Sequence, residues 1–469
     1  MNTKQFFNGG NLTTIILALL VAISGCGSDE EKPPVGGTLT ADAGNDWNTL
    51  AGETVNLNGN GSFSQPVGPF TFDWKFLSKP TGSSAVLVDA DQATPSFQAD
   101  AQGKYKVVLT TSNDMTSDRD TVTIAAFSVV TLPGTYTNMT PGPDVGIRKL
   151  AVAKDLLYAT CEFTTIGGIT AYKIACYDGS RWWALGSGLE DGSIFDMIEY
   201  LDDLYVTGQF EMIGGIEAKN IAIWDGFNWE PVGTGIGEGT EEVGYALEVF
   251  QDELYIGGRF TRAGDELVVN MTKWDGNKFY EIGSFEEGSV RELQVYNNAL
   301  YAGGFFESFT GSNTESIARY DGSQWNDLGS TDNLELGSTG VVRHMEVFQG
   351  LLFISGDFNA SGTDISELIT YDGSQYRDFG RAFSLFGGNE IKTLSTFQNG
   401  LYIGGSFNPV VGTQASNLLK WDGQEWAIMA EGIDGVTLSI QPFQNQLYIG
   451  GEFEQAGGQS AENISIWNE

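Results

Sequence analysis

The sequence is short of histidine, cysteine and positive charge. Its 469 residues include one histidine, His344, and three cysteines. A copper, zinc or haem site built on several histidine ligands is therefore excluded, and His344 alone cannot support a Ser-His-Asp triad. Lysine and arginine number 24 against 61 aspartate and glutamate residues, a net charge of -37. Such a surface repels nucleic acid, so we expect no nucleic-acid partner.

Glycine and aromatic residues, by contrast, are abundant. Glycine occurs 62 times, aromatic residues make up 12% of the chain, and no long stretch shows the apolar period of a helix. This composition is typical of short strands joined by tight turns and predicts an all-β protein. A hydrophobic fraction of 41% over this length is enough for two or three globular domains.

An export signal is predicted for residues 1–25. Lys4 precedes "TTIILALLVAISGC", an apolar stretch that is short for a membrane span and ends in small residues before Cys26. The residues Ile-Ser-Gly-Cys at 23–26 resemble a bacterial lipobox, with Ile in place of the usual Leu. The resemblance implies cleavage before Cys26 and its lipidation, which would anchor the protein to a membrane. The alternative is an ordinary signal peptide followed by a chance cysteine.

A flexible tether is predicted for residues 26–38. The stretch "GSDEEKPPVGG" after Cys26 is acidic and rich in proline and glycine. Its acidic run resembles the surface-export signal of lipoproteins in the Bacteroidota, which implies display on the outer membrane of a bacterial cell envelope.

In that oxidising exterior, Cys161 and Cys176 either form a disulfide, which would contribute about 3 kcal/mol, or remain buried free thiols.

Residues 39–127 show the pattern of an immunoglobulin-like sandwich. Runs such as "FTFDWKF" and "KYKVVLTTSN" alternate in polarity and are separated by Gly, Ser, Pro and Asp clusters. Trp74 is placed to fill the space between two sheets, and Asp100, Gly103 and Tyr105 fit the corner before a late strand. Together with "ADAGNDWNTLAGETVNLNGNGS", these features resemble the PKD family of extracellular modules. The resemblance implies a spacer or weak adhesion module without catalysis.

Calcium is the one cofactor that this domain suggests, and we expect no other. Asp42, Asp46 and Asp114 could hold a calcium ion, but they are better explained as solvated turn residues. The chain also lacks the Asp-x-Asp-x-Asp-Gly pattern of a calcium-binding loop.

Beyond residue 145 one phrase recurs seven times: Leu, an aromatic residue, two small residues and then Phe. The copies are Leu157–Phe163, Leu204–Phe210, Leu254–Phe260, Leu300–Phe306, Leu352–Phe358, Leu401–Phe407 and Leu447–Phe453. Aromatic-Asp-Gly turns follow at Tyr177, Trp224, Trp274, Tyr320, Tyr371 and Trp421, and Trp467-Asn468 follows the last copy; the turn aromatics lie 46 to 51 residues apart. Each period contains four extended segments, which predicts seven blades of a β-propeller.

The connections of each predicted blade alternate in length. In the second copy the first and third are tight, whereas "EMIGGIEAKN" and the link "TGIGEGTEEVG" are long. Antiparallel order places both long connections on one face, where we expect any function to lie.

The last copy has three strands, because the chain ends directly after its turn segment. An open blade edge exposes unpaired backbone groups, so we predict that residues 136–139 supply the missing strand and pair with Ile464–Trp467. The propeller then spans 130–469. Its tandem glycines and aromatic-Asp turns resemble the kelch family, the fold also used by galactose oxidase, although "CEF", "GQF" and "SGDF" depart from a strict glycine pair.

Seven residues share one register, ten positions before the aromatic of each recurring phrase. They are Arg148, Phe195, Tyr245, Arg291, Arg343, Lys392 and Leu438, and His344 adjoins the set. We predict that they ring the mouth of the central channel, where the four cations bind a carboxylate, sulfate or phosphate group. The alternative is that each cation pairs with a neighbouring acid such as Glu292 or Glu346 and braces adjacent blades.

These observations favour a lipid-anchored, surface-exposed recognition or adhesion protein that binds a glycan or an envelope protein on the long-loop face and has no catalytic residue. An alternative is an extracellular hydrolase or lyase of acidic polysaccharide, which needs two carboxylates near the cations. Its candidates are Asp196, Glu248, Glu292 and Glu346. A third hypothesis is a scaffold for another envelope protein.

Overall fold

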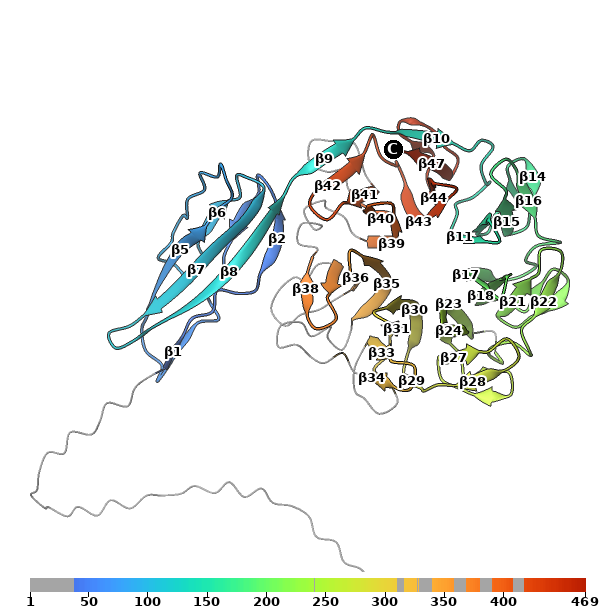
Figure 1. Cartoon of the computed structure of the whole chain (residues 1–469), viewed down its shortest axis with the longest axis horizontal. Coiled ribbons are helices and arrows are strands. Elements are labelled where there is room, and N and C mark those ends of the chain that lie inside the picture. Colours follow the sequence, from blue (N-terminus) through green and yellow to red (C-terminus); the bar gives the residue numbers. More distant parts are fainter. Residues whose placement is uncertain are drawn as a thin grey trace, which may run out of the picture.

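The computed structural model describes residues 38–239, 241–309, 316–326, 328, 340–357, 368–379, 390–407 and 417–469. Every regular element in these ranges is a strand, which confirms the all-β prediction. The strands form a sandwich and a ring of sheets that lie side by side (Figure 1). None of the described segments forms a helix that could cross a membrane. Residues 1–37, with the predicted signal peptide and Cys26, lie outside the described part.

The sandwich consists of one four-stranded sheet and two short two-stranded sheets. The large sheet has the order β2-β8-β7-β5, with β2 parallel to β8, and the small sheets pair β1 with β4 and β3 with β6. The strands are β1 (Thr38–Thr40), β2 (Trp47–Leu50), β3 (Thr54–Asn56), β4 (Phe63–Gln65), β5 (Thr71–Ser78), β6 (Ser96–Gln98), β7 (Gly103–Ser112) and β8 (Ser117–Phe127). Trp74 and Tyr105 are among the most buried side chains of its core, which confirms the predicted immunoglobulin-like sandwich.

The corner before β7 is built as predicted. The backbone N–H of Ala101 donates to the Tyr105 hydroxyl at 2.8 Å, and this hydroxyl lies 3.0 Å from a carboxylate oxygen of Asp100. The Trp74 indole N–H donates to the Gln92 carbonyl at 3.1 Å. Both large side chains therefore bury their rings while their polar groups stay hydrogen-bonded.

The second part is a seven-bladed propeller, as predicted, and the first strand of each blade is the innermost (Figure 1). Blades 1 to 3 are β11 (Lys149–Ala153), β12 (Leu156–Thr160), β15 (Ile174–Tyr177) and β16 (Trp182–Ala184); β17 (Ser193–Tyr200), β18 (Asp203–Gln209), β21 (Ile221–Trp224) and β22 (Trp229–Pro231); and β23 (Val243–Phe250), β24 (Glu253–Arg259), β27 (Met271–Trp274) and β28 (Phe279–Glu281). Blades 4 and 5 are β30 (Ser289–Tyr296), β31 (Ala299–Phe305), β33 (Ile317–Tyr320) and β34 (Trp325–Asn326); and β35 (Val341–Phe348), β36 (Leu351–Asp357), β37 (Leu368–Tyr371) and β38 (Tyr376–Asp378). Blades 6 and 7 are β39 (Glu390–Phe397), β40 (Gly400–Ser406), β41 (Leu418–Trp421), β42 (Trp426–Met429) and β9 (Val129–Leu132); and β43 (Val436–Phe443), β44 (Gln446–Glu452), β47 (Ile464–Asn468) and β10 (Thr135–Asn138).

The ring closes in blade 7 with a strand from upstream of blade 1. β10 pairs antiparallel with β47 and places Tyr136 opposite Trp467, with ring centroids 4.9 Å apart. The predicted closure and its register are confirmed, except that the paired strand begins one residue earlier and Met139 lies outside it. The edge of blade 7 is thereby covered.

A fifth strand in blade 6 was not predicted. β9 directly follows the sandwich and pairs in parallel with β42, the outer strand of this blade. Phe127, at the end of β8, lies edge-on to Trp421 with ring centroids 4.8 Å apart. Residues of the sandwich and of blade 6 therefore share one hydrophobic cluster, so the two parts contact each other directly.

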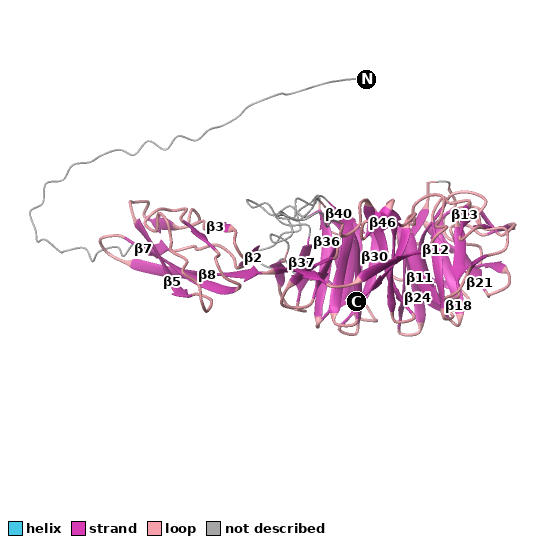
Figure 2. Ribbon diagram, turned by 90° about the horizontal axis from the view of Figure 1, so that it is seen from above, coloured by secondary structure: helices cyan, strands magenta, loops and turns pink. Residues whose placement is uncertain are grey.

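In blades 1, 2, 3 and 7 the long connection within the blade forms a small hairpin, and these hairpins lie on one face (Figure 2). The hairpins are β13 (Thr165–Ile166) with β14 (Ile169–Thr170), β19 (Met212–Ile213) with β20 (Ile216–Glu217), β25 (Arg262–Ala263) with β26 (Glu266–Leu267), and β45 (Gln455–Ala456) with β46 (Gln459–Ser460); in blade 4, β32 (Ser308–Phe309) pairs instead with β29 (Phe285–Glu286). A buried Asn follows several of them: Asn220 accepts the Phe210 N–H and donates to the Ile236 carbonyl, both at 2.9 Å. Asn270, Asn417 and Asn463 repeat this pattern. We call this side of the propeller the hairpin face.

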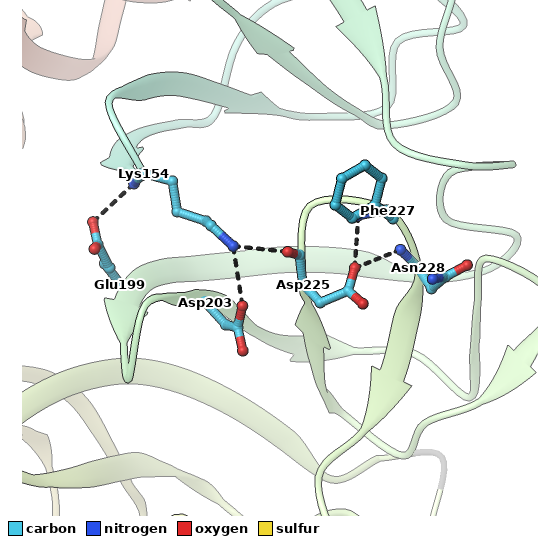
Figure 3. Close-up of polar contacts among 6 residues, drawn as sticks. All are labelled: Lys154, Glu199, Asp203, Asp225, Phe227 and Asn228. Carbon is cyan, nitrogen blue, oxygen red and sulfur yellow. Dashed lines mark hydrogen bonds and ion pairs between the residues drawn. The ribbon is translucent and has the colours of Figure 1, made fainter.

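The opposite face carries the tight turns between strands of one blade, and a side chain of one such turn contacts the neighbouring blade. Lys154, in the first turn of blade 1, lies with its Nζ 3.1 Å from Asp203 Oδ1 and donates to the Asp225 carbonyl at 2.7 Å (Figure 3). In turn, Asp225 Oδ1 accepts the backbone N–H groups of Phe227 and Asn228. The aspartate of the aromatic-Asp-Gly turn is therefore structural.

Candidate functional site

The innermost strands surround a central channel with a volume of about 750 Å³. All residues of the predicted register line it: Arg148, Phe195, Tyr245, Arg291, Arg343, Lys392 and Leu438, together with His344. Each is the third residue of the first strand in blades 2 to 7, and Arg148 directly precedes β11. Because the links from the preceding blades enter at this end of the strands, the ring lies at the channel mouth on the hairpin face.

A β-bulge recurs at this position and explains how two successive residues line the channel. In blades 2 to 7 the pairing of the first and second strands shifts at the register residue, for example between Ile194 and Asp196. Side chains of a regular strand would alternate between its two faces, and a bulge interrupts that alternation. Phe195 and Asp196 therefore both line the channel, as do Arg343 and His344.

The four rim cations differ in their partners. Arg343 Nη2 lies 2.6 Å from Asp357, and Lys392 Nζ lies 2.6 Å from Glu390. Arg148 and Arg291 instead lie over aromatic rings, with their Cζ atoms 5.2 Å and 5.5 Å from the ring centroids. The expected pairing with Glu292 or Glu346 is absent from the ion pairs of the described residues. Half of the rim cations are thus neutralised, by acids other than those predicted.

Beneath the rim lies a layer of carboxyl groups with one lysine. Lys149 Nζ lies 2.7 Å from Asp196 Oδ1, and the other oxygen of Asp196 accepts the Leu247 N–H at 2.8 Å. A Glu346 oxygen accepts the Thr396 hydroxyl at 2.7 Å. The four carboxylates proposed for an enzyme, Asp196, Glu248, Glu292 and Glu346, all line the channel.

Three of these carboxyl groups are shifted strongly toward their neutral form. Burial, followed by the charges of Asp196 and other channel acids, raises the pKa of Glu292 to about 8 against the opposing effect of Lys149. Burial likewise raises the pKa values of Glu248 and Glu346 to about 7. Burial is the largest cause for all three groups, and the charges of neighbouring acids add to it for Glu248 and Glu292.

His344 is neutral at physiological pH. Burial, with the positive charges of Lys149, Arg343 and Lys392, lowers its pKa to about 3. Its Nδ1 lies 4.0 Å from a Glu292 oxygen, but with a neutral imidazole this contact is not an ion pair.

The predicted site residues Cys161 and Cys176 do not line the channel. Cys161 and Cys176 are free thiols, so the disulfide alternative is wrong. Thr160 lies opposite Ile174 in the β12–β15 ladder. When this register is continued, the two cysteines are not opposite each other: they are displaced along the strands by about three positions, or roughly 10 Å. A disulfide requires Cα atoms within about 7 Å.

The acidic residues considered for calcium serve the backbone of the sandwich. Asp42 accepts the Gly44 N–H at 2.9 Å, Asp46 accepts the Thr123 N–H at 2.6 Å, and Asp114 is exposed. Within the described ranges, no group of three or more His, Cys, Asp or Glu side chains is placed to hold a metal ion.

No protein-family model matches the chain, and no curated protein matches it. Among solved structures, the PKD domain of human KIAA0319 is 22% identical and matches 23% of this chain and 98% of that domain, with a TM-score of 0.19. A quinonprotein alcohol dehydrogenase-like protein from Bacteroides thetaiotaomicron is 10% identical over 92% of this chain and 98% of that one, with a TM-score of 0.33. The β-propeller domain of the Trilobed protease from Pyrococcus furiosus is 12% identical over 73% and 95%, with a TM-score of 0.32. The fold assignment rests on the strand order described above, and these neighbours add nothing about function.

Proposed function

We propose that the protein is a lipid-anchored recognition protein of the bacterial cell surface that binds an acidic glycan at the channel mouth. The lipobox-like Cys26 and the acidic tether support the anchor and surface display. The recurring tandem-glycine phrase and the aromatic-Asp-Gly turns support a kelch-type propeller. The sandwich would then serve as a spacer that contacts blade 6.

The observation that carries this proposal is the gathering of cations at one mouth. Four of the 24 basic residues of a chain with 61 acidic ones line a single channel at one level. Convergent guanidinium and ammonium groups at the mouth of a poorly solvated cavity are suited to carboxylate and sulfate groups. Elsewhere the net negative charge repels acidic polymers, so capture should depend on this rim.

Removing all four rim cations should abolish capture of acidic glycans. The variant carries Arg148→Ala, Arg291→Ala, Arg343→Ala and Lys392→Ala, and binding is measured on an array of carboxylated, sulfated and neutral glycans. A matched control removes four exposed cations of the sandwich, Lys75, Lys104, Lys106 and Arg119, and so changes the net charge equally. Capture by the parent and the control but not by the rim variant is expected. Absence of acidic-glycan capture by the parent, or equal loss in both variants, would contradict the proposal, and co-purification of an envelope protein instead would favour the scaffold hypothesis.

A second candidate, hydrolysis or elimination of an acidic polysaccharide, is favoured by the channel carboxyl groups. Glu292, with a pKa of about 8, can hold a proton at neutral pH, while Asp196 is held by Lys149 in the same layer. A protonated acid and a carboxylate in one cavity are the pair that glycoside cleavage uses.

This candidate predicts release of reducing ends from an acidic polysaccharide such as polygalacturonate. Glu292→Gln should lower that rate at least about 100-fold, because general acid catalysis contributes factors of this size, whereas binding of the polymer should persist. Binding of the polymer without any release of reducing ends would remove the candidate and leave the recognition proposal intact.

A further inference from the structure

Four residues from blades 1 to 4 form a continuous arc at the channel mouth, which we call the aromatic arc. Arg148 lies over the Phe195 ring at 5.2 Å, the Phe195 and Tyr245 rings lie 5.5 Å apart at 58°, and Arg291 lies over the Tyr245 ring at 5.5 Å. All four line the channel, and none is fully buried. The arc thus consists of two adjacent rings flanked by two guanidinium groups.

The polar groups of the arc keep most of their hydrogen-bonding capacity. Within the described residues, the Arg148 guanidinium makes no hydrogen bond or ion pair, and Arg291 makes one hydrogen bond, from its Nε to the Ser289 hydroxyl at 3.2 Å. Glu162, an acid whose pKa the Arg148 charge helps to lower, is itself bound by Lys173 at 2.8 Å. A ring face orients a guanidinium without neutralising its charge. Both arginines therefore present N–H donors that have no partner among the described residues, and the rings hold them at a fixed position.

The other side of the rim lacks these properties. Asp357 neutralises Arg343, Glu390 neutralises Lys392, and blade 7 contributes the apolar Leu438. An incoming anion would have to displace an existing ion pair there, whereas at the arc it meets unpaired donors. The rim is therefore asymmetric, and its receptive half is the half that also carries the aromatic rings.

We infer that the aromatic arc is a subsite for an acidic oligosaccharide, in which one sugar packs on Phe195 and Tyr245 while Arg148 and Arg291 take acid groups on either side of it. Aromatic faces offer flat apolar area for the C–H faces of a sugar, and the Tyr245 hydroxyl adds a polar group. The planar fork of arginine matches carboxylate and sulfate geometry. This inference rests on the proposed function and assigns it a ligand class and a place on the rim.

Calorimetric titration of the full chain with tetragalacturonate tests the arc. The neutral maltotetraose and inorganic sulfate are the two reference ligands, since the first lacks the acid and the second lacks the sugar. Arg148→Ala and Arg291→Ala should each weaken tetragalacturonate binding about tenfold or more, and Phe195→Ala should do so about tenfold. The matched variant Lys104→Ala, which removes an exposed cation of the sandwich, should change it less than about threefold. Sulfate binding should weaken in the two arginine variants and stay unchanged in Phe195→Ala, and maltotetraose should bind at least about tenfold more weakly than tetragalacturonate.

The outcomes separate this inference from the function on which it rests. If tetragalacturonate binds and only Arg343→Ala and Lys392→Ala weaken it, the arc is overturned while the glycan proposal stands. The arc is likewise overturned if Phe195→Ala binds tetragalacturonate as the parent does. If no acidic glycan binds, both the proposed function and the aromatic-arc subsite are contradicted. Tyr245→Phe keeps the ring and loses only the hydroxyl, so it should weaken binding less than Phe195→Ala does, and matching circular dichroism spectra exclude misfolding as the cause of a loss.

Discussion

Replacing Trp467 by alanine should lower the free energy of unfolding of the propeller by about 3–5 kcal/mol, the usual cost of deleting a buried aromatic side chain. Trp467 is 1% exposed and lies in β47, opposite Tyr136 of β10. It belongs to a cluster that also contains Tyr402 of blade 6, so it links two blades as well as two strands. Because β10 and β47 come from opposite ends of the propeller sequence, the ring has no covalent connection at this point and depends on their packing.

Urea unfolding followed by circular dichroism measures this loss, and Phe227→Ala provides a matched control. Phe227 is also aromatic and also in a blade of the propeller, but it is 85% exposed at a turn, so its removal should cost less than about 0.5 kcal/mol. In Trp467→Ala, amide hydrogen exchange should rise first in β10 and β47. A loss below about 1 kcal/mol, or faster exchange spread evenly over all blades, would show that the closure does not limit the stability of the ring.

The closure could be predicted from the sequence because it follows from counting. Each copy has four extended segments, the last has three, and "TYTNM" upstream of the first has the pattern of the missing one. The structure places Tyr136 opposite Trp467, in the relation that Trp229 has to Trp224 in blade 2. Because all copies of a repeat share one geometry, both the strand order and the register of the closing strand could be predicted from the other copies.

The fifth strand of blade 6 and the bulges could not be predicted in the same way. β9 occurs once, so no repeat reveals it, and "VVTL" is equally suited to a linker and to an edge strand. A bulge has no sequence signature of its own at Phe195, Arg291 or Lys392, which differ in size, charge and polarity. The shared register showed that these residues lie at one level of the channel, but not that their successors line it too.

The acids that pair with the rim cations were the feature hardest to predict from the sequence. Glu292 and Glu346 are close to Arg291 and Arg343 in sequence, but they lie deeper in the channel, whereas Asp357 and Glu390 come from the end of β36 and the start of β39. The pairing depends on which neighbouring strand ends reach the rim. Repetition cannot supply this information, since each blade carries a different residue there.

The carboxyl layer beneath the rim has a consequence for stability. The pKa values of Glu248, Glu292 and Glu346 are raised to about 7, 8 and 7, so in this range of pH the folded protein binds more protons than the unfolded chain. Stability must then fall as the pH rises from about 4.5 through these values. His344 acts oppositely below pH 6.5, because its pKa is lowered to about 3 and the unfolded chain binds its proton more readily. The His344 effect offsets at most one of the three extra protons and is lost above pH 6.5, so the interval above this pH reports the carboxyl groups without it.

Between pH 6.5 and 8.5 the protein should therefore lose stability on the order of 3 kcal/mol, and Glu292→Gln should remove about 2 kcal/mol of that decline. Glutamine resembles the protonated acid but cannot ionise, so the variant lacks the largest single contribution to the loss of stability with rising pH. Urea unfolding at a series of pH values measures both slopes, and Glu217→Gln, which alters a side chain 71% exposed on the hairpin face, should leave the slope unchanged. A parent protein whose stability is flat or rises over this interval, or a Glu292→Gln variant with the parental slope, would show that the channel carboxyl groups are solvated and charged at neutral pH. The rim would then stand above four negative charges, which would oppose the binding of any acidic ligand.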